Sequence, residues 1–107
     1  VESALLQNKD GKFVTPGNSA ETLAATKIPE DMIAWAPDPE GANSYPIVTY
    51  TWMIFRKNNS DAQKAKAMRD MVEFGLTEGQ KMADALGYIP LPQSVVEQVR
   101  KAAANIK

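Results

Sequence analysis

The chain has 107 residues, 44% of them hydrophobic, which suffices for one modest core and at most one domain. Lysine and arginine number 12 against 13 aspartates and glutamates, and the two signs alternate without forming a basic stripe. This balance, a formal net charge of −1, argues against nucleic acid as a partner. The absence of histidine and cysteine excludes disulfides, thiolate nucleophiles, Cys/His zinc sites and imidazole bases.

The apolar runs and the first residues of the chain bear on its origin. No apolar run approaches the about 20 residues that a membrane-spanning helix needs. The first three residues, Val1, Glu2 and Ser3, include neither a methionine nor the basic start of a signal peptide. We therefore expect the chain to be a processed or truncated product of a longer protein.

The first half predicts short elements. Residues 3–14 favour a β-hairpin, because an Asp-Gly turn at 10–11 separates two short apolar runs. A short helix is expected over residues 19–26, with Asn18 as N-cap and Glu21 completing a capping box. Residues 27–45 are punctuated by proline and glycine and predict irregular structure, above all around residues 37–41.

Residues 47–56 carry the strongest strand signal of the chain. They are rich in β-branched and aromatic residues, and both faces of the expected strand are apolar. Such a strand belongs inside a sheet that is covered on both sides. The chain offers only a distant hairpin as a neighbour, so we expect the rest of the sheet in another chain or in a part of the protein outside this sequence.

The second half predicts three helices. Ser60 with Gln63 forms the capping box of the first, and Thr77 with Gln80 marks the start of the second, which Gly87 ends. The two prolines near Leu91 predict an extended segment over residues 88–92. A last amphipathic helix is expected over residues 93–106.

The carboxylates are the first candidates for chemistry. Most of them fall in turns, first helical turns or polar helix faces, where capping and solvation explain them, and the Asp-Pro-Glu at 38–40 has too few oxygens for a calcium loop. We therefore expect no catalytic and no metal-binding residue among Asp10, Glu21, Glu30, Asp31, Asp38, Glu40, Asp61, Asp70, Glu73, Glu78, Asp84 and Glu97.

An anion could bind the N–H groups at a helix start. The three expected starts, at Asn18, Ser60 and Thr77, have neither a glycine-rich approach nor an arginine fork, so no phosphate-binding residue is assigned. Arg56 and Arg100 are expected only as surface salt-bridge partners.

Apolar side chains could also line a binding face. A methionine stripe at 68, 71 and 82 could form a plastic binding surface, but its helical spacing favours the core. Tyr50 and Trp52 could stack on a ligand, but their position among isoleucine and valine likewise favours core packing. No cofactor is expected.

Three segments resemble a known family. The run from Leu86 to Arg100, in which Gly-Tyr-Ile-Pro-Leu-Pro precedes an amphipathic helix, resembles the C-terminal signature of the phosphate-binding subunits of bacterial phosphate ABC transporters. Residues 45–51, with Pro-Ile-Val-Thr, are similar to the return strand of that family, and residues 10–16 to the turn and helix start before it.

This resemblance implies an α/β fold that forms part of a two-lobed periplasmic-binding-protein architecture. Residues 1–45 would be the end of the second lobe and residues 46–52 a crossover hinge strand. Residues 53–107 would be the C-terminal helices of the first lobe. In such receptors the lobes close around the ligand, and we expect residues 46–50 to bend during closure.

The resemblance further implies a non-enzymatic solute-binding component of phosphate import. The intact protein would bind inorganic phosphate and deliver it to an ABC transporter permease, in the periplasm or at the cell surface, with or without a lipid anchor. The family takes its phosphate ligands from its first two-thirds, so this chain would need the N-terminal part of the same protein as its partner. Two alternatives stay open: a binding protein for another oxyanion, and a free-standing, domain-swapped interaction module.

Overall fold

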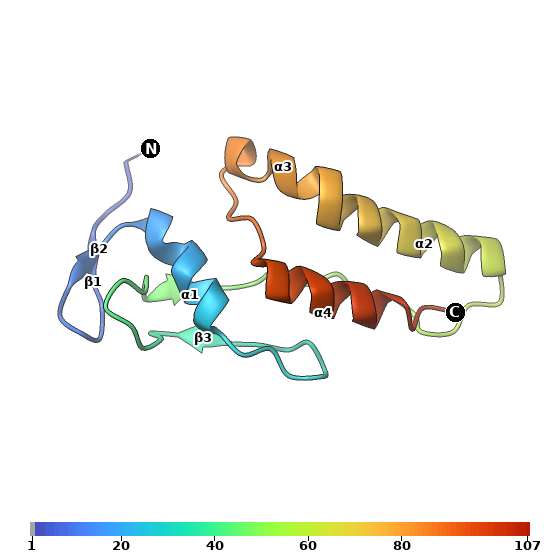
Figure 1. The fold of residues 1–107 in the computed structure, drawn as a ribbon, viewed down its shortest axis with the longest axis horizontal. Helices are drawn as coiled ribbons and strands as arrows, with labels where there is room; N and C mark the ends of the chain where they lie inside the picture. Colours follow the sequence, from blue (N-terminus) through green and yellow to red (C-terminus); the bar gives the residue numbers. More distant parts are fainter. Residues whose placement is uncertain (1) are drawn as a thin grey trace. The chain divides into compact units, whose positions relative to one another are not determined.

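The computed structural model describes residues 2–107, which form two compact units divided between Thr51 and Trp52. Small two-stranded sheets and a short helix make up the first unit, and helices the second (Figure 1). The α/β class predicted from the sequence is therefore confirmed. In the part of the chain that is described, no helix has the length and apolarity to cross a membrane.

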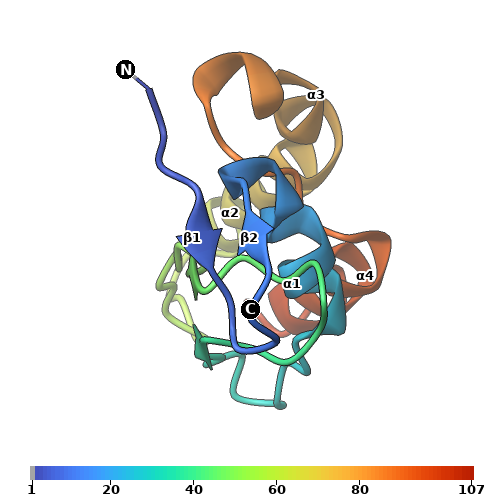
Figure 2. The same cartoon turned by 90° about the vertical axis from the view of Figure 1, so that its left-hand side faces the viewer.

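The first unit begins with the predicted hairpin. β1 (Leu6–Gln7) pairs antiparallel with β2 (Phe13–Val14), with Leu6 opposite Val14, and the two strands lie side by side in Figure 2. Gly11 in the connecting turn has φ of 78°, which a residue without a side chain adopts at no steric cost. The Asp-Gly signal thus identified the turn correctly.

The short helix follows as expected, but its cap differs. α1 (Ser19–Ala25) is preceded by a 3-10 turn, η1 (Pro16–Asn18). The Asn18 side chain turns backwards, and its Oδ1 accepts the Thr15 N–H at 3.2 Å and the Thr15 hydroxyl at 3.0 Å. Since that oxygen accepts hydrogen bonds from the preceding turn and none from the helix, the predicted capping box of Asn18 with Glu21 is wrong.

A second small sheet contradicts two expectations. β3 (Ala36–Pro37) pairs antiparallel with β4 (Ile47–Val48), so the segment expected to be irregular contributes a strand. The strand expected over residues 47–56 is only two residues long. No strand lies beside residues 49–56 within the described range, and a β-ladder requires a hydrogen-bonded neighbour.

The second unit contains one long helical rod where two helices were predicted. α2 (Ala62–Phe74) continues through a π-helical turn, η2 (Gly75–Gly79), into α3 (Gln80–Met82), so the helix start expected at Thr77 does not exist. The N-cap of α2 is Asp61 and not Ser60. Asp61 Oδ1 accepts the N–H groups of Gln63 and Lys64 at 2.8 and 3.2 Å.

The end of the rod and the last helix follow the prediction. A 3-10 turn, η3 (Asp84–Leu86), leads to Gly87, whose φ of 78° is the left-handed conformation that commonly ends helices. After an extended segment, α4 (Gln93–Ala103) runs alongside α2 in the opposite direction (Figure 1). It stops three residues before the predicted end.

Each unit has its own small core. In the first unit the buried apolar residues are Val14, Leu23, Ala34, Ala36 and Tyr50, and in the second they are Ala65, Leu76, Val95, Val96 and Ile106. Met71 and Met82 are each 48% exposed, so the methionine stripe is not a core stripe as predicted. Ala65 is the buried residue of α2, and Val95 and Val96 are those of α4.

Candidate functional site: the anchored connecting segment

The candidate carboxylates do not converge. Across residues 2–107 no group of three acidic side chains could hold a metal ion. Several instead form single surface ion pairs: Lys9 with Glu40, Lys66 with Asp70, and Lys81 with Glu78. Exposed pairs of this kind contribute little to stability and carry no chemistry.

The predicted helix starts do not form an anion site either. At α2 the Asp61 carboxylate already occupies the free N–H groups and brings a negative charge to the place where an anion would bind. At α1 the Asn18 side chain serves the preceding turn. Thr77 lies inside the helical rod and donates its hydroxyl to the Glu73 carbonyl at 2.8 Å.

A hollow of about 300 Å³ lies beside the start of α2 in the second unit. Its polar lining includes Arg56 and Lys64, but also the Asp61 carboxylate that caps the helix. The apolar lining comes from Ile54, Phe55 and Met68. A site for an anion requires converging donors without a competing carboxylate, and this hollow does not provide them.

Buried polar side chains gather instead around residues 44–50. These residues lead out of the first unit and are called the connecting segment below. Asn8 is 6% exposed, and its Nδ2 donates to the carbonyls of Gly41, Ala42 and Ser44 at 3.3, 3.0 and 3.2 Å. The Oδ1 of Asn8 accepts the N–H of Lys12 at 3.0 Å within its own hairpin. One side chain thus joins the hairpin to the loop before the connecting segment.

Thr22 of α1 holds the next position of this segment. Its side chain is fully buried, and its Oγ1 accepts the Tyr45 N–H at 2.8 Å. The Thr22 carbonyl accepts the Thr26 hydroxyl at 2.8 Å. The backbone at Tyr45 is therefore held against α1 by a partly buried hydrogen bond to a fully buried side chain.

Tyr50 marks the far end of the anchored stretch. Its ring is buried, and its hydroxyl donates to the Leu23 carbonyl in α1 at 3.1 Å. Burial raises the pKa of the Tyr50 phenol, because the charged phenolate would lose its hydration. The expectation of core packing is confirmed for Tyr50, whereas Trp52 is 38% exposed and does not join the core.

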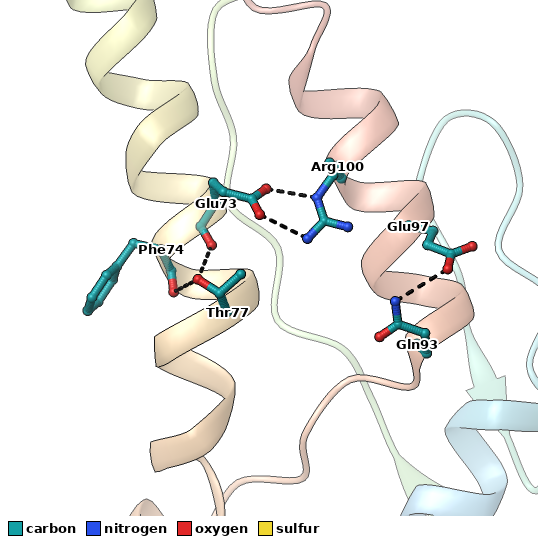
Figure 3. Close-up of polar contacts among 6 residues, drawn as sticks. All are labelled: Glu73, Phe74, Thr77, Gln93, Glu97 and Arg100. Carbon is teal, nitrogen blue, oxygen red and sulfur yellow. Dashed lines mark hydrogen bonds and ion pairs between the residues drawn. The ribbon is translucent and has the colours of Figure 1, made fainter.

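A second polar contact joins the two long helices of the second unit (Figure 3). Arg100 of α4 donates Nε and Nη2 to the two Glu73 carboxylate oxygens at 2.8 and 2.9 Å. The Arg100 hydrogen bond and charge lower the pKa of Glu73, and the same pairing raises the pKa of Arg100. Arg100 is thus a salt-bridge partner as predicted, while Arg56 forms no ion pair within residues 2–107.

The sequence interpretation missed Asn8 and Thr22. Asn8 had a usable signal, since an asparagine before an Asp-Gly turn often bonds the backbone of its own turn. Its three bonds to residues more than thirty positions away had no local signal. Thr22 had none, because a threonine within a short helix usually faces solvent or bonds its own helix.

Comparison with known proteins shows a relationship that the local geometry of the chain does not reveal. No protein-family model matches the chain. The phosphate-binding protein PstS of Methanocaldococcus jannaschii is 34% identical over 119 residues, a match that covers 97% of this chain and 31% of that protein. The chain is related to a segment of the PstS proteins.

Two further PstS proteins support this relationship. That of Xylella fastidiosa is 33% identical over 88% of the chain, and that of Pasteurella multocida is 28% identical over 91%. The chain spans only 27 to 31% of the length of these three relatives. The resemblance to phosphate-binding proteins is confirmed. All three relatives are named as PstS binding proteins, which agrees with the expectation of a non-enzymatic protein.

Proposed function

We propose that this chain is the structural, C-terminal third of a receptor that binds inorganic phosphate for import. The observation that carries the proposal is the PstS match across 97% of the chain. The intact receptor would work in the periplasm or at the cell surface, free or lipid-anchored. It would deliver phosphate to the permease of an ABC transporter.

Residues 1–45 would then close the second lobe, residues 46–52 would form the crossover strand, and residues 53–107 would complete the first lobe. The exposed segment after Thr51 supports this placement. Met53 is 63% and Ile54 95% exposed, and the described part of the chain provides no backbone hydrogen bond to either. An apolar extended segment of this kind needs strands on its flanks, which the remaining two-thirds of a PstS-like protein would supply.

The anion itself would be held outside this chain. Asp61 at the start of α2 is unfavourable for an anion, and the α1 start has a single turn of 3-10 helix before it. The contribution of this chain would be the anchored connecting segment and the helices of one lobe.

Calorimetry tests this proposal directly. Inorganic phosphate would be titrated into the 107-residue chain and into the longer protein that contains it, with sulfate as the matched anion. We expect phosphate to bind the longer protein only. Tight binding to the short chain would contradict the assignment of the site to the remaining residues, and preference for sulfate would favour a receptor for another oxyanion.

A size measurement on the same short chain tests the second alternative. A domain-swapped interaction module would form a discrete, well-folded oligomer that neither binds phosphate nor changes when the rest of the protein is present. Gel filtration with light scattering distinguishes such an oligomer from a chain that associates only through its exposed segment.

A further inference from the structure

We propose that Asn58 is the attachment site of an N-linked oligosaccharide. Asn58, Asn59 and Ser60 form the acceptor pattern Asn-x-Ser, in which the middle residue is any residue except proline. In an exported protein this pattern marks a surface loop that can carry a glycan. The inference rests on one part of the proposed function, namely that the receptor works in the periplasm or at the cell surface.

The structure places this tripeptide on an exposed bend just before α2 (Figure 1). Residues 57–60 belong to no helix or strand, and Asn58 and Ser60 are both exposed. The basic residues before them, Arg56 and Lys57, are exposed as well. Connecting segments of this kind run over protein surfaces, so we expect the bend to stay exposed in the longer protein.

The two side chains that the pattern requires are free of competing hydrogen bonds. The sequence predicted Ser60 in the capping box of this helix, but Asp61 accepts the first N–H groups of α2. The Ser60 hydroxyl is therefore left without a hydrogen bond among residues 2–107, and the Asn58 side chain has none there either. A glycosyltransferase could engage both groups without breaking a contact of the fold.

Asn59, by contrast, is tied to the end of the chain. Its N–H and its Nδ2 both donate to the Lys107 carbonyl, at 2.6 and 3.1 Å. The Lys107 N–H in turn donates to the Lys57 carbonyl at 2.7 Å. These bonds hold the residues on either side of Asn58, so the bend has a fixed base from which the free amide of Asn58 extends.

The other asparagines of the chain lack the pattern. None of them is followed by serine or threonine two positions later. Asn43 and Asn105 are exposed, but Tyr45 and Lys107 stand at these positions. Asn8 is only 6% exposed. Exposed asparagines without the hydroxyl therefore serve as controls within the same chain.

The transferred group would come from an oligosaccharide linked to a polyprenyl diphosphate. A bond forms between Asn58 Nδ2 and the anomeric carbon of the first sugar. The bond between that carbon and the diphosphate oxygen breaks, and its electron pair stays with the lipid diphosphate. The amide nitrogen gives up one proton to solvent, so the step is a group transfer without oxidation or reduction.

Peptide mapping by mass spectrometry, on the longer protein purified from its natural source, tests the proposal. We expect a glycan on the peptide that contains Asn58 and none at Asn43 or Asn105. Asn58→Gln and Ser60→Ala should abolish the modification, whereas Ser60→Thr should retain it, because threonine also supplies the hydroxyl. All three variants should fold like the natural protein, which circular dichroism checks, because they change exposed side chains without hydrogen bonds.

Two results would overturn the proposal. One is an unmodified Asn58 in the natural protein. The other is a modification that survives Ser60→Ala, because it would not depend on the Asn-x-Ser pattern.

Failure of the proposed function gives a different result. A longer protein that binds phosphate but carries no glycan would refute the glycan site alone. A glycosylated protein that does not bind phosphate would refute the phosphate receptor and leave the glycan site standing.

Discussion

Three polar side chains of the first unit, all buried, have defined partners in other elements. Asn8, Thr22 and Tyr50 bind backbone groups in other elements. Among residues 2–107, no buried side-chain nitrogen or oxygen lacks a hydrogen bond. Because such groups are costly to leave unsatisfied, single residues hold this small unit together where a large core would otherwise be needed.

Tyr50 should make the first unit sensitive to alkaline pH. Its raised pKa means that the folded state holds the phenol proton more tightly than the unfolded state does. The stabilisation is complete below the unfolded pKa of about 10 and is lost as pH rises from there toward the folded pKa. Thermal unfolding between neutral and alkaline pH should show a steeper loss for the natural chain than for Tyr50→Phe.

The exposed Tyr88 provides the control for this measurement. Tyr88→Phe should keep the full alkaline loss of the natural chain. Equal pH profiles for the natural chain and Tyr50→Phe would show that the Tyr50 hydroxyl does not stabilise the folded state.

The pair of Glu73 and Arg100 should have the opposite pH dependence. Because the pKa of Glu73 is lowered, its contribution is present above the unfolded pKa of about 4.3 and is lost as pH falls through the lower folded pKa. Glu73→Gln should therefore lower the melting temperature at pH 7, and the difference should close under acid. Both side chains are about half exposed, so added salt should also shrink the difference.

Glu78, which pairs only with Lys81 within the same rod, offers a comparison. Glu78→Gln should change the melting temperature less than Glu73→Gln, because the Glu78 side chain makes no contact with a second helix. A Glu73→Gln effect that persists unchanged at low pH would contradict the ionic origin of this contact.

At the level of elements, one glutamine ties the extended segment to the helical rod. Gln80 donates Nε2 to the Gly75 carbonyl at 3.1 Å and accepts the Leu91 N–H with Oε1 at 2.6 Å. The segment between the rod and α4 has no regular structure of its own. Its course is set by this side chain and by the prolines that flank Leu91.

Two glycines of the rod provide a matched test of backbone conformation. Gly87 has φ of 78° and Gly75 has φ of −60°, and an added Cβ would meet no atom within 4 Å at either position. Gly87→Ala should lower the stability of the second unit by about 1 kcal/mol, because alanine disfavours the left-handed region. Gly75→Ala should raise it by about 0.5 to 1 kcal/mol, since alanine is the better helix former.

Chemical denaturation followed by circular dichroism measures both variants. If Gly87→Ala and Gly75→Ala changed the stability of the second unit in the same direction, the conformations assigned to these two positions would be contradicted.

At the scale of the whole molecule, the exposed apolar segment should govern association. Ile54 is 95% exposed and lies next to Met53, which is 63% exposed. We expect the 107-residue chain to associate as its concentration rises, and Ile54→Lys to reduce this association without changing the melting temperature. Sedimentation velocity over a concentration series measures the effect.

In the longer protein, Ile54→Lys should change the stability rather than the association. There the proposed sheet would bury residue 54, so a lysine should lower the melting temperature by an amount typical of a buried charge. An unchanged melting temperature would contradict the placement of this segment inside the first lobe.

The sequence by itself determined the features that depend on neighbours along the chain. The Asp-Gly turn, the stop at Gly87, the extended run around Leu91 and the amphipathic α4 all follow from backbone preferences and periodicity. The resemblance of residues 86–100 to phosphate-binding proteins was likewise present in the sequence alone.

Only the tertiary structure decided the rest, because those features depend on residues far apart in the chain. The apolar run at 47–56 reads as a long strand, yet a strand exists only where a partner offers hydrogen bonds, and here that partner is β3 for two residues. Thr22 and Asn8 became anchors because folding brought Tyr45 and the loop at 41–44 to their buried polar atoms. The local sequence determines which backbone conformations are low in free energy, and contacts between residues far apart in the chain select among them.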